Sequence, residues 1–344
     1  MSVTKPSLLA VVTGSWTMPV AIACVVAIVG LDLNPYLLFL LTRIVIFVML
    51  IIGLNVLMGY SGQLSFAHAA LFGVGAYATG LLQVHLGVPF AVAIFAATVG
   101  VMGFGTLMVL PALRLSGIHL AIATLAIAQA VHWVLINWTS VTFGAGGFRA
   151  PAIRLFGLDK TQTVFLIALA STTICYLLVH QLTRTSFGRR FVAVRDNPVA
   201  AAANGVNVTA VKTVAFALSA AIAGLAGGLY SALLGFVAPE SFNLEQMILM
   251  KIMTVVGGLG TMVGSAIGPA LVIVLQEQLR ESQGWLEVIF GAMLIGFVLF
   301  LPNGLAPLLK RLLGHGPRVE PVALAPRTGQ PADPKAAAMN AGGN

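Results

Sequence analysis

The sequence predicts an all-α, polytopic integral membrane protein, a helical bundle of about ten spans. Hydrophobic residues make up 59% of its 344 positions and charged residues only 8%, whereas about a quarter of the residues of a soluble domain are charged. The run from Ile44 to Leu113 contains no Asp, Glu, Lys or Arg, and neither does Leu115 to Phe148. Because a membrane span needs roughly 20 apolar residues, the first run alone holds about three spans.

Turn signals such as Asp32–Pro35 and Gly87–Pro89 divide the apolar runs into candidate spans. The first run is longer than the roughly 7–15 residues of a signal-peptide core, so we interpret it as a retained span. Near the other end, Gly257–Thr261 interrupts an apolar segment and predicts two short helices around a glycine break. The candidate spans are residues 8–31, 36–58, 62–83, 88–111, 115–138, 162–183, 213–236, 246–260, 264–280 and 286–303.

Basic residues cluster at two places and predict the orientation of the bundle. One cluster flanks the polar loop 184–212, against the single acid Asp196, and the other follows the last apolar run. Because cytoplasmic loops of membrane proteins are rich in Lys and Arg, we expect this loop and both termini to be cytoplasmic. The crossings between them must then be even in number, which favours ten spans, with eight or nine as the alternative. The orientation of the chain in a membrane explains this excess of basic residues better than binding to nucleic acid does.

Composition divides the chain at residue 312. Residues 1–312 hold all the candidate spans and form the predicted transmembrane domain, with 184–212 as its cytoplasmic loop. Residues 313–344 are rich in Pro, Gly and Ala and contain few large apolar side chains. Such a segment cannot bury enough surface to fold, so we predict a disordered cytoplasmic tail.

Small residues form a stripe along the third candidate span, 62–83. Their spacing by three and four places them on one face of a helix. Lipid gives helices no hydrophobic reason to associate, and close backbone approach through small side chains takes its place. The stripe is therefore predicted to be a helix-packing seam, or the wall of a translocation path that has to slide. Its members are Gly62, Ser65, Ala69, Gly73, Ala76 and Gly80.

Three polar side chains lie within apolar segments. Gln63 stands where a helix could begin, and a free helix N-terminus attracts a carboxylate in some transporters. His68 falls on a different face from the stripe; an ionisable group inside a membrane points to function, although a hydroxyl or carbonyl partner would satisfy a neutral imidazole. Lys251, near the start of a short span, is interpreted as reaching the interface with its long side chain.

The loop 184–212 carries the signal of a short helix outside the membrane. Asp196 and Asn197 are good N-cap residues, Pro198 suits the first helical position and Gly205 suits the stop. A helix of about two turns is barely stable alone in water, so its own bundle or a partner's groove must hold it. We therefore predict a docking helix rather than a mere connector. The predicted docking residues are Arg195, Asp196, Asn197, Pro198, Ala200, Ala201 and Gly205.

The sequence lacks the motifs of an enzyme. No glycine is followed by lysine, so there is no Walker-type nucleotide loop, and any ATP must be used by another chain. Neither Cys24 nor Cys175 has the spacing of a metal or redox motif. We expect no catalytic residue, no metal site and no cofactor bound by this chain.

Four stretches, in this order, resemble the membrane permease of branched-chain amino acid ABC importers, specifically the LivM-type subunit. They read GLNVLMGYSGQLSFAHAALFGVGAYATGLL, GRRFVAVRDNPVAAAANGVNV, SAAIAGLAGGLYSALLGFVAPESF and VVGGLGTMVGSAIGPAL. The resemblance covers about residues 36–305 and implies the ABC importer permease fold in a bacterial inner membrane. It also implies that Pro198–Gly205 is the loop that docks onto the ATPases, although Val199 stands where an acidic residue is often found.

The resemblance further implies a set of partners. These are a second, LivH-type permease subunit, two ABC ATPase subunits that carry ATP and Mg, and a periplasmic solute-binding protein. Branched-chain amino acids are the favoured solute, but the family also carries urea and short-chain amides, and specificity lies largely in the binding protein. Two other classes stay open: an ATP-independent secondary carrier, which would need an ion site in mid-membrane, and a passive channel, which would need no docking helix.

Overall fold

The computed structural model describes residues 8–112, 115, 117–151, 153, 157–280, 291–292, 295–296 and 304–305, with side chains from residue 19 onward. The predicted all-α class is confirmed within this part of the chain. The longer helices are α1 (Leu8–Leu31), α2 (Pro35–Asn55), α3 (Ala67–Leu86), α4 (Phe90–Val109), α5 (Ile118–Asn137), α7 (Lys160–Arg184) and α10 (Val208–Leu234). The shorter elements are the π-helix η1 (Val56–Tyr60), α6 (Thr139–Thr142), η3 (Gly144–Gly146), β1 (Phe148–Arg149), α8 (Ser186–Asp196), α9 (Pro198–Ala203), β2 (Phe236–Val237), η4 (Pro239–Phe242), α11 (Leu244–Gly257) and α12 (Gly264–Leu279).

Six helices in the described residues are long and apolar enough to cross a membrane. Each overlaps one of the predicted spans between residues 36 and 236. The count of about ten is not confirmed, because α11 and α12 are shorter than a span and the side chains of α1 are described only over Pro19–Leu31. The predicted span 286–303, apart from residues 291–292 and 295–296, and the predicted tail 313–344 lie outside the described residues. The six spans are Pro35–Tyr60, Ala67–Leu86, Phe90–Val109, Ile118–Asn137, Lys160–Arg184 and Val208–Leu234.

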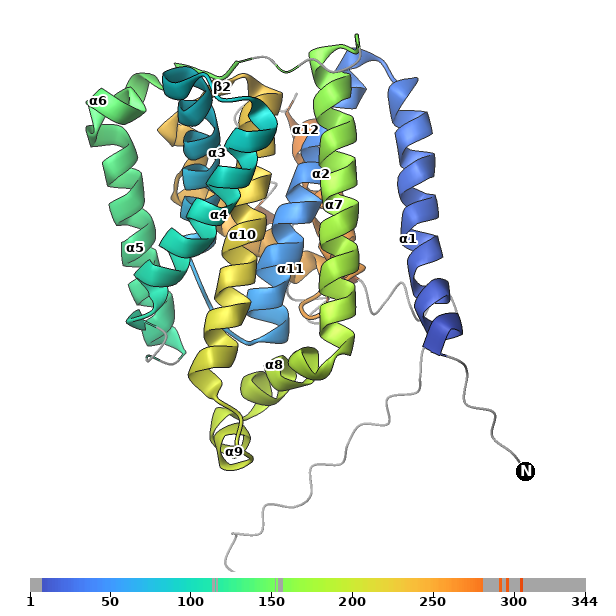
Figure 1. The fold of residues 1–344 in the computed structure, drawn as a ribbon, viewed down its shortest axis with the longest axis vertical. Coiled ribbons are helices and arrows are strands. Elements are labelled where there is room, and N and C mark those ends of the chain that lie inside the picture. Colours follow the sequence, from blue (N-terminus) through green and yellow to red (C-terminus); the bar gives the residue numbers. More distant parts are fainter. Residues whose placement is uncertain are drawn as a thin grey trace, which may run out of the picture. The chain divides into compact units, whose positions relative to one another are not determined.

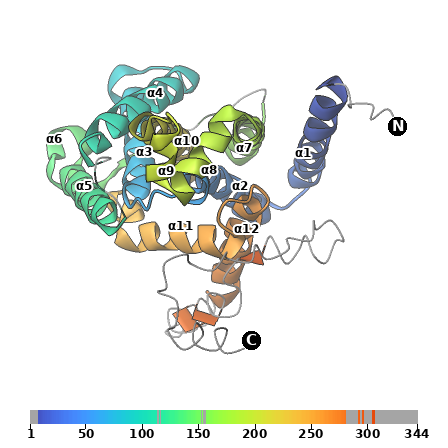
Figure 2. The ribbon, with the colours of Figure 1, turned by 90° about the horizontal axis from the view of Figure 1, so that it is seen from below.

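The segment after α10 forms two short helices around a glycine break, as predicted. α11 has 14 residues and α12 has 16, about 21 and 24 Å at 1.5 Å per residue, against roughly 30 Å of membrane hydrocarbon. Between them Gly258 and Gly260 have φ angles of 114° and 72°, which glycine adopts without strain. Figure 2 shows α11 from the side, whereas α7 and α10 are seen nearly end on. α11 therefore lies steeply inclined to the other helices.

α10 occupies the centre of the bundle and packs against α2, α3, α4 and α7 (Figures 1 and 2). Its backbone touches that of α3, because the two helices meet through glycines. A Cβ on Gly75 would lie 2.6 Å from Cα of Gly224, and one on Gly227 would lie 2.7 Å from the backbone N of Ala76. Real Cβ atoms are not found this close, so any larger residue at these positions would separate the two helices.

A small antiparallel pair of strands closes one end of the bundle. Phe148 of β1 faces Val237 of β2, and Arg149 faces Phe236. The ring of Phe148 lies over α3, with its centroid 5.5 Å from that of Tyr77. Residues 139–161 lie between two predicted spans, and the sequence gives no signal for this pairing, because two-residue strands leave no periodic pattern.

Replacing Gly227 by leucine should separate α3 from α10. Overpacking a close helix contact costs about 1–3 kcal/mol, so we expect Gly227→Leu to lower the thermal unfolding midpoint of the detergent-purified protein. Gly100→Leu on α4 is the matched control, since a Cβ there would meet nothing within 4 Å. Equal midpoints for the two variants would contradict the assignment of this contact as the central one.

Candidate functional site

Two short helices project from the bundle at the end opposite β1 and β2 (Figure 1). The side chain of Thr185 caps α8 by accepting a hydrogen bond from the Phe187 backbone N–H. The side chain of Asn197 caps α9 by accepting from the backbone N–H groups of Val199 and Ala200. α9 begins at Pro198, and the chain leaves it through Gly205 at φ 78°. The predicted short helix is present, and a second helix, α8, which was not predicted, precedes it.

The predicted docking residues divide between the outer and inner sides of this helix pair. Asp196, Asn197, Pro198, Ala200 and Gly205 are exposed, whereas Ala201 is buried. Val199 presents an apolar side chain that is 79% exposed. The outer end of the helix pair therefore offers an apolar surface beside the polar cap residues. Ala201, on the inner side of α9, is buried against the rest of the chain.

Arg195, the next-to-last residue of α8, connects the helix pair to the bundle. Its Nη1 donates to the carbonyl oxygen of Gly59 on η1 at 2.9 Å, and its Nε donates to Asp196 at 2.9 Å. Its aliphatic carbons cover Gly62, where an added Cβ would lie 2.6 Å from Cγ of Arg195. Gly62 also has a φ of 68°, which a β-carbon would disfavour. Gly62 is therefore a turn residue beneath Arg195.

The same π-helix is fixed on its other side to the glycine break between α11 and α12. Asn55, at the end of α2, is buried and makes three hydrogen bonds across this junction. Its Nδ2 donates to the Thr261 carbonyl and to the Ser265 hydroxyl, both at 2.8 Å, and its Oδ1 accepts from the Gly260 N–H at 2.7 Å. π-helices are uncommon and concentrate at functional sites. We name the contact of Arg195, Gly59, Asn55 and Gly260 the η1 junction.

The third span begins at Ala67 and not at residue 62, so the predicted six-residue stripe is wrong in its first part. Gly62 lies in the connection between η1 and α3, where its positive φ ends the preceding helix. Ser65 also precedes the helix, and its hydroxyl accepts from the Ala67 N–H at 3.2 Å. Gln63 donates through Nε2 to the Ser61 hydroxyl at 2.8 Å and to the Lys212 carbonyl at 3.2 Å.

The remaining members of the stripe lie on α3 but contact different elements. Gly73 faces the ring of Phe242, because a Cβ added to Gly73 would lie 2.9 Å from Cγ of Phe242. Gly80 faces the ring of Phe148. Ala76 lies beside Gly227 of α10, and Ala69 borders a small cavity. Among the glycines of α3, it is Gly75, on the neighbouring face, that meets the backbone of α10. The Gly-rich stretch around Gly224 and Gly227 was the available sequence signal for it.

His68 is fully enclosed and joins three helices. Its Nε2 lies 3.0 Å from the Leu50 carbonyl on α2, and its Nδ1 lies 3.0 Å from the Ser219 hydroxyl on α10. The structure thus supplies both a carbonyl and a hydroxyl partner for the imidazole. This pairing makes His68 a structural link between α2, α3 and α10.

Lys251 on α11 does not reach an exposed surface, so its interpretation as a snorkelling residue is wrong. Its Nζ atom is buried and lies 2.7 Å from the ring centroid of Phe66. The backbone N–H of Phe66 donates to the Thr124 hydroxyl on α5 at 2.9 Å. α11 crosses one side of the bundle at a steep angle (Figure 2), with the Nζ atom of Lys251 turned inward. A sequence pattern does not contain that angle.

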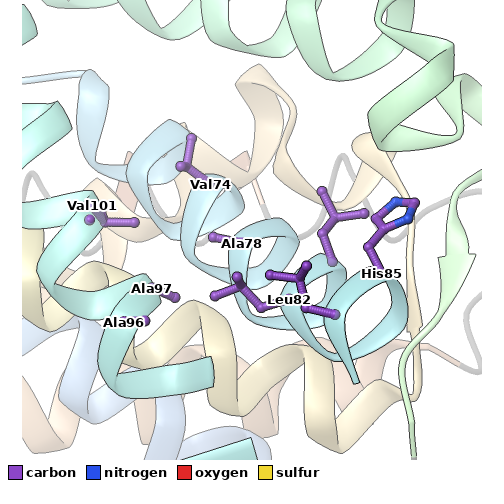
Figure 3. A pocket seen from close by; sticks show the side chains of 10 residues that line it. Val74, Ala78, Leu82, His85, Ala96, Ala97 and Val101 are labelled. Carbon is purple, nitrogen blue, oxygen red and sulfur yellow. The ribbon is translucent and has the colours of Figure 1, made fainter. Parts of the chain in front are cut away.

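An apolar cavity of about 480 Å³ lies apart from these polar groups, between α3 and α4. Figure 3 shows Val74, Ala78 and Leu82 of α3 opposite Ala96 and Val101 of α4, with His85 at one end. Walls of this kind suit hydrocarbon and offer a polar solute almost no hydrogen bonds. Within the residues that the structure describes, no group of His, Cys, Asp or Glu is arranged to hold a metal ion.

Six apolar helices of membrane length, with a helix pair hydrogen-bonded to one end of their bundle, are those of a multi-pass membrane protein. Residues 36–300 match the family described as the permease component of branched-chain amino acid transport systems, and the chain belongs to this family. The resemblance seen in the sequence is thereby confirmed.

Individual relatives agree with this assignment. Over 295 residues the chain is 30% identical to the high-affinity branched-chain amino acid transport system permease proteins LivM of Salmonella typhimurium and Escherichia coli, covering 78% of this chain and 69% of theirs. It is 33% identical over 138 residues to the autoinducer 2 import system permease protein LsrC of Klebsiella pneumoniae, covering 38% of this chain and 40% of that one. These relatives are transport components and not enzymes. No solved structure matches the chain.

Replacing Asn55 by alanine should weaken the η1 junction. The variant leaves the Gly260 N–H and the Thr261 carbonyl without this partner, at a cost of about 1–3 kcal/mol for each buried group. We expect a lower thermal midpoint for Asn55→Ala and faster hydrogen exchange in the break at residues 258–263. Asn137→Ala is the control, because the amide of Asn137 is exposed and bonds only locally, to Trp133. An unchanged exchange rate in the break would contradict the bracing role of Asn55.

Proposed function

We propose that this chain is the transmembrane permease subunit of an ATP-driven ABC importer for branched-chain or related small amino acids. The observation that carries the proposal is the helix pair α8–α9, which is well capped, apolar at its end and tied to the bundle through Arg195. A channel or an independent carrier has no need of such an attachment point. Membership of the permease family and the LivM relatives support the choice of solute.

The proposed partners follow from this role. Two ABC ATPase subunits bind ATP and Mg and receive α9, a second LivH-type permease subunit completes the path, and a periplasmic binding protein delivers the solute. The assembly lies in the bacterial inner membrane with α8–α9 and both termini in the cytoplasm, and the complete chain has about ten spans. Relatives of this chain serve import systems for different solutes, since the LsrC proteins belong to an import system for autoinducer 2. Urea, short-chain amides or other small solutes are therefore the alternative cargo.

The η1 junction supplies a physical route for coupling. When the ATPases close, they displace α9 and α8 together, because α8 ends where the Asn197 cap of α9 begins. Arg195 then pulls on the Gly59 carbonyl, and Asn55 carries the displacement to the break between α11 and α12. The glycine break lets these two short helices turn against α2. Such movement opens the bundle alternately to each side.

Introducing a charge at Val199 should prevent docking. A lysine there places an ammonium group in an interface that we expect to be apolar, so Val199→Lys should abolish co-purification of the ATPase subunits from detergent extracts. Leu86→Lys is the control, because Leu86 is also exposed, at 68%, but is the last residue of α3 and lies outside the helix pair. Recovery of the ATPases with Val199→Lys would place the docking surface elsewhere. Uptake by the isolated chain without ATP would instead support the carrier or channel.

Removing the Arg195 side chain should separate ATP hydrolysis from transport. Arg195→Ala loses the hydrogen bond to Gly59 but keeps the α9 surface, so we expect the assembled complex to hydrolyse ATP while solute uptake per ATP falls roughly tenfold, as for the loss of a charged hydrogen bond. Arg189→Ala is the control, since Arg189 contacts only Ser186 on its own helix among the described residues. An unchanged ratio of uptake to hydrolysis would exclude Arg195 from the coupling route.

A further inference from the structure

Lys251 places an ammonium group inside the bundle, and no acidic side chain of the described residues pairs with it. Its Nζ atom is buried and has no hydrogen-bond partner among the described residues. The ion pairs in that part of the chain join Arg195 to Asp196 and Arg280 to Glu277, and neither includes Lys251. The ring of Phe66 offers a cation–π contact, worth about 0.5–2 kcal/mol. This contact is weaker than the cost of burying an unpaired charge. An anion bound beside the ammonium group would therefore stabilise it.

A second positive feature lies at the same place. Phe66 is the N-cap residue of α3, and this cap has no side-chain hydrogen bond. Figure 1 shows the connection after α2 rising back toward the bundle before α3 begins. The N-terminus of a helix carries a partial positive charge and free N–H groups that favour an anion. The ammonium group of Lys251 and the positive N-terminus of α3 repel each other unless a negative group lies between them.

A small cavity lies near this point, among α3, α5 and the start of α11, although neither Lys251 nor Phe66 lines it. It measures about 10 Å³, roughly the space of one water molecule. Three of its lining residues stand four residues along the chain from a residue at the lysine: Met247 precedes Lys251, Ala70 follows Phe66 and Ala128 follows Thr124. His132 also borders the cavity, and its Nδ1 is buried with no hydrogen-bond partner among the described residues.

We infer that Lys251 binds the carboxylate of the transported solute at the meeting point of α3, α5 and α11. The N–H groups of the first turn of α3 favour the same anion, apart from that of Ala67, which donates to Ser65. The space beside Met247 and Ala70, which now holds about one water molecule, takes the aliphatic side chain only once it widens. In the conformation described here the path along these helices is closed, and it widens when α11 moves. The site selects solutes that carry a carboxylate over urea, amides and neutral sugars. This inference rests on the proposed function and specifies its substrate class.

The test compares two probes that differ only at the carboxylate. The detergent-purified full-length chain, alone and with its co-purified subunits, is melted in the presence of L-leucine or L-leucinamide. Because a ligand that binds the folded state stabilises it more as its concentration exceeds its Kd, we expect L-leucine to raise the midpoint and L-leucinamide, at the same concentration, not to. The variant Lys251→Met should lose this difference and should melt no lower than wild type without ligand, since it removes an unpaired buried charge.

Two further variants separate charge at this site from charge elsewhere. Lys251→Arg keeps a cation and should retain the difference between the probes, and Lys160→Gln removes a lysine at the other end of the bundle and should also retain it. Equal midpoint shifts for the two probes in wild type, or a difference that survives in Lys251→Met, would overturn the inference. These outcomes are independent of the proposed function, which fails instead if no ATPase subunits co-purify.

Discussion

The backbone contact between α3 and α10 is the constraint on which the rest of the structure depends. Gly75, Gly224 and Gly227 bring the two helices closer than any side chain would permit. In a membrane such contact replaces the hydrophobic effect, because lipid solvates apolar side chains as well as a protein interior does. Once α10 is fixed against α3, its other faces receive α2, α4 and α7. The aromatic rings of Phe72 and Tyr230, whose centroids lie 5.2 Å apart, fill the space beside the glycines.

Around this fixed contact the chain contains elements that are short or locally irregular. η1 is a π-helix, and α11 and α12 are separated by glycines in left-handed conformations. Asn55 and Arg195 hold these irregular elements to each other and to α8 through hydrogen bonds rather than through packed apolar surface. Hydrogen bonds can exchange partners over a small displacement, whereas a packed core resists one. The molecule therefore combines a rigid centre with a junction suited to movement.

The buried polar side chains fall into two kinds. Those of His68 and Asn55 have their partners within the chain, so they join helices and stabilise the bundle. The ammonium group of Lys251 has none among the described residues, and this is costly in a medium of low dielectric constant. The first kind explains how the bundle holds together. The second kind marks the place where a ligand completes the structure.

The sequence by itself determined the class of protein, six of its spans, the capped helix at Pro198 and the family. These features depend on local composition, on the 3.6-residue period and on motifs of contiguous residues. It did not determine the start of α3 at Ala67, because the positive φ of Gly62 and the anchoring of Phe66 to Thr124 arise from contacts distant in sequence. Only the tertiary structure decided that Gly75 and not Gly73 meets the backbone of α10, and that Lys251 turns inward. Both depend on the angles at which helices cross, which are set by the packing of the whole bundle.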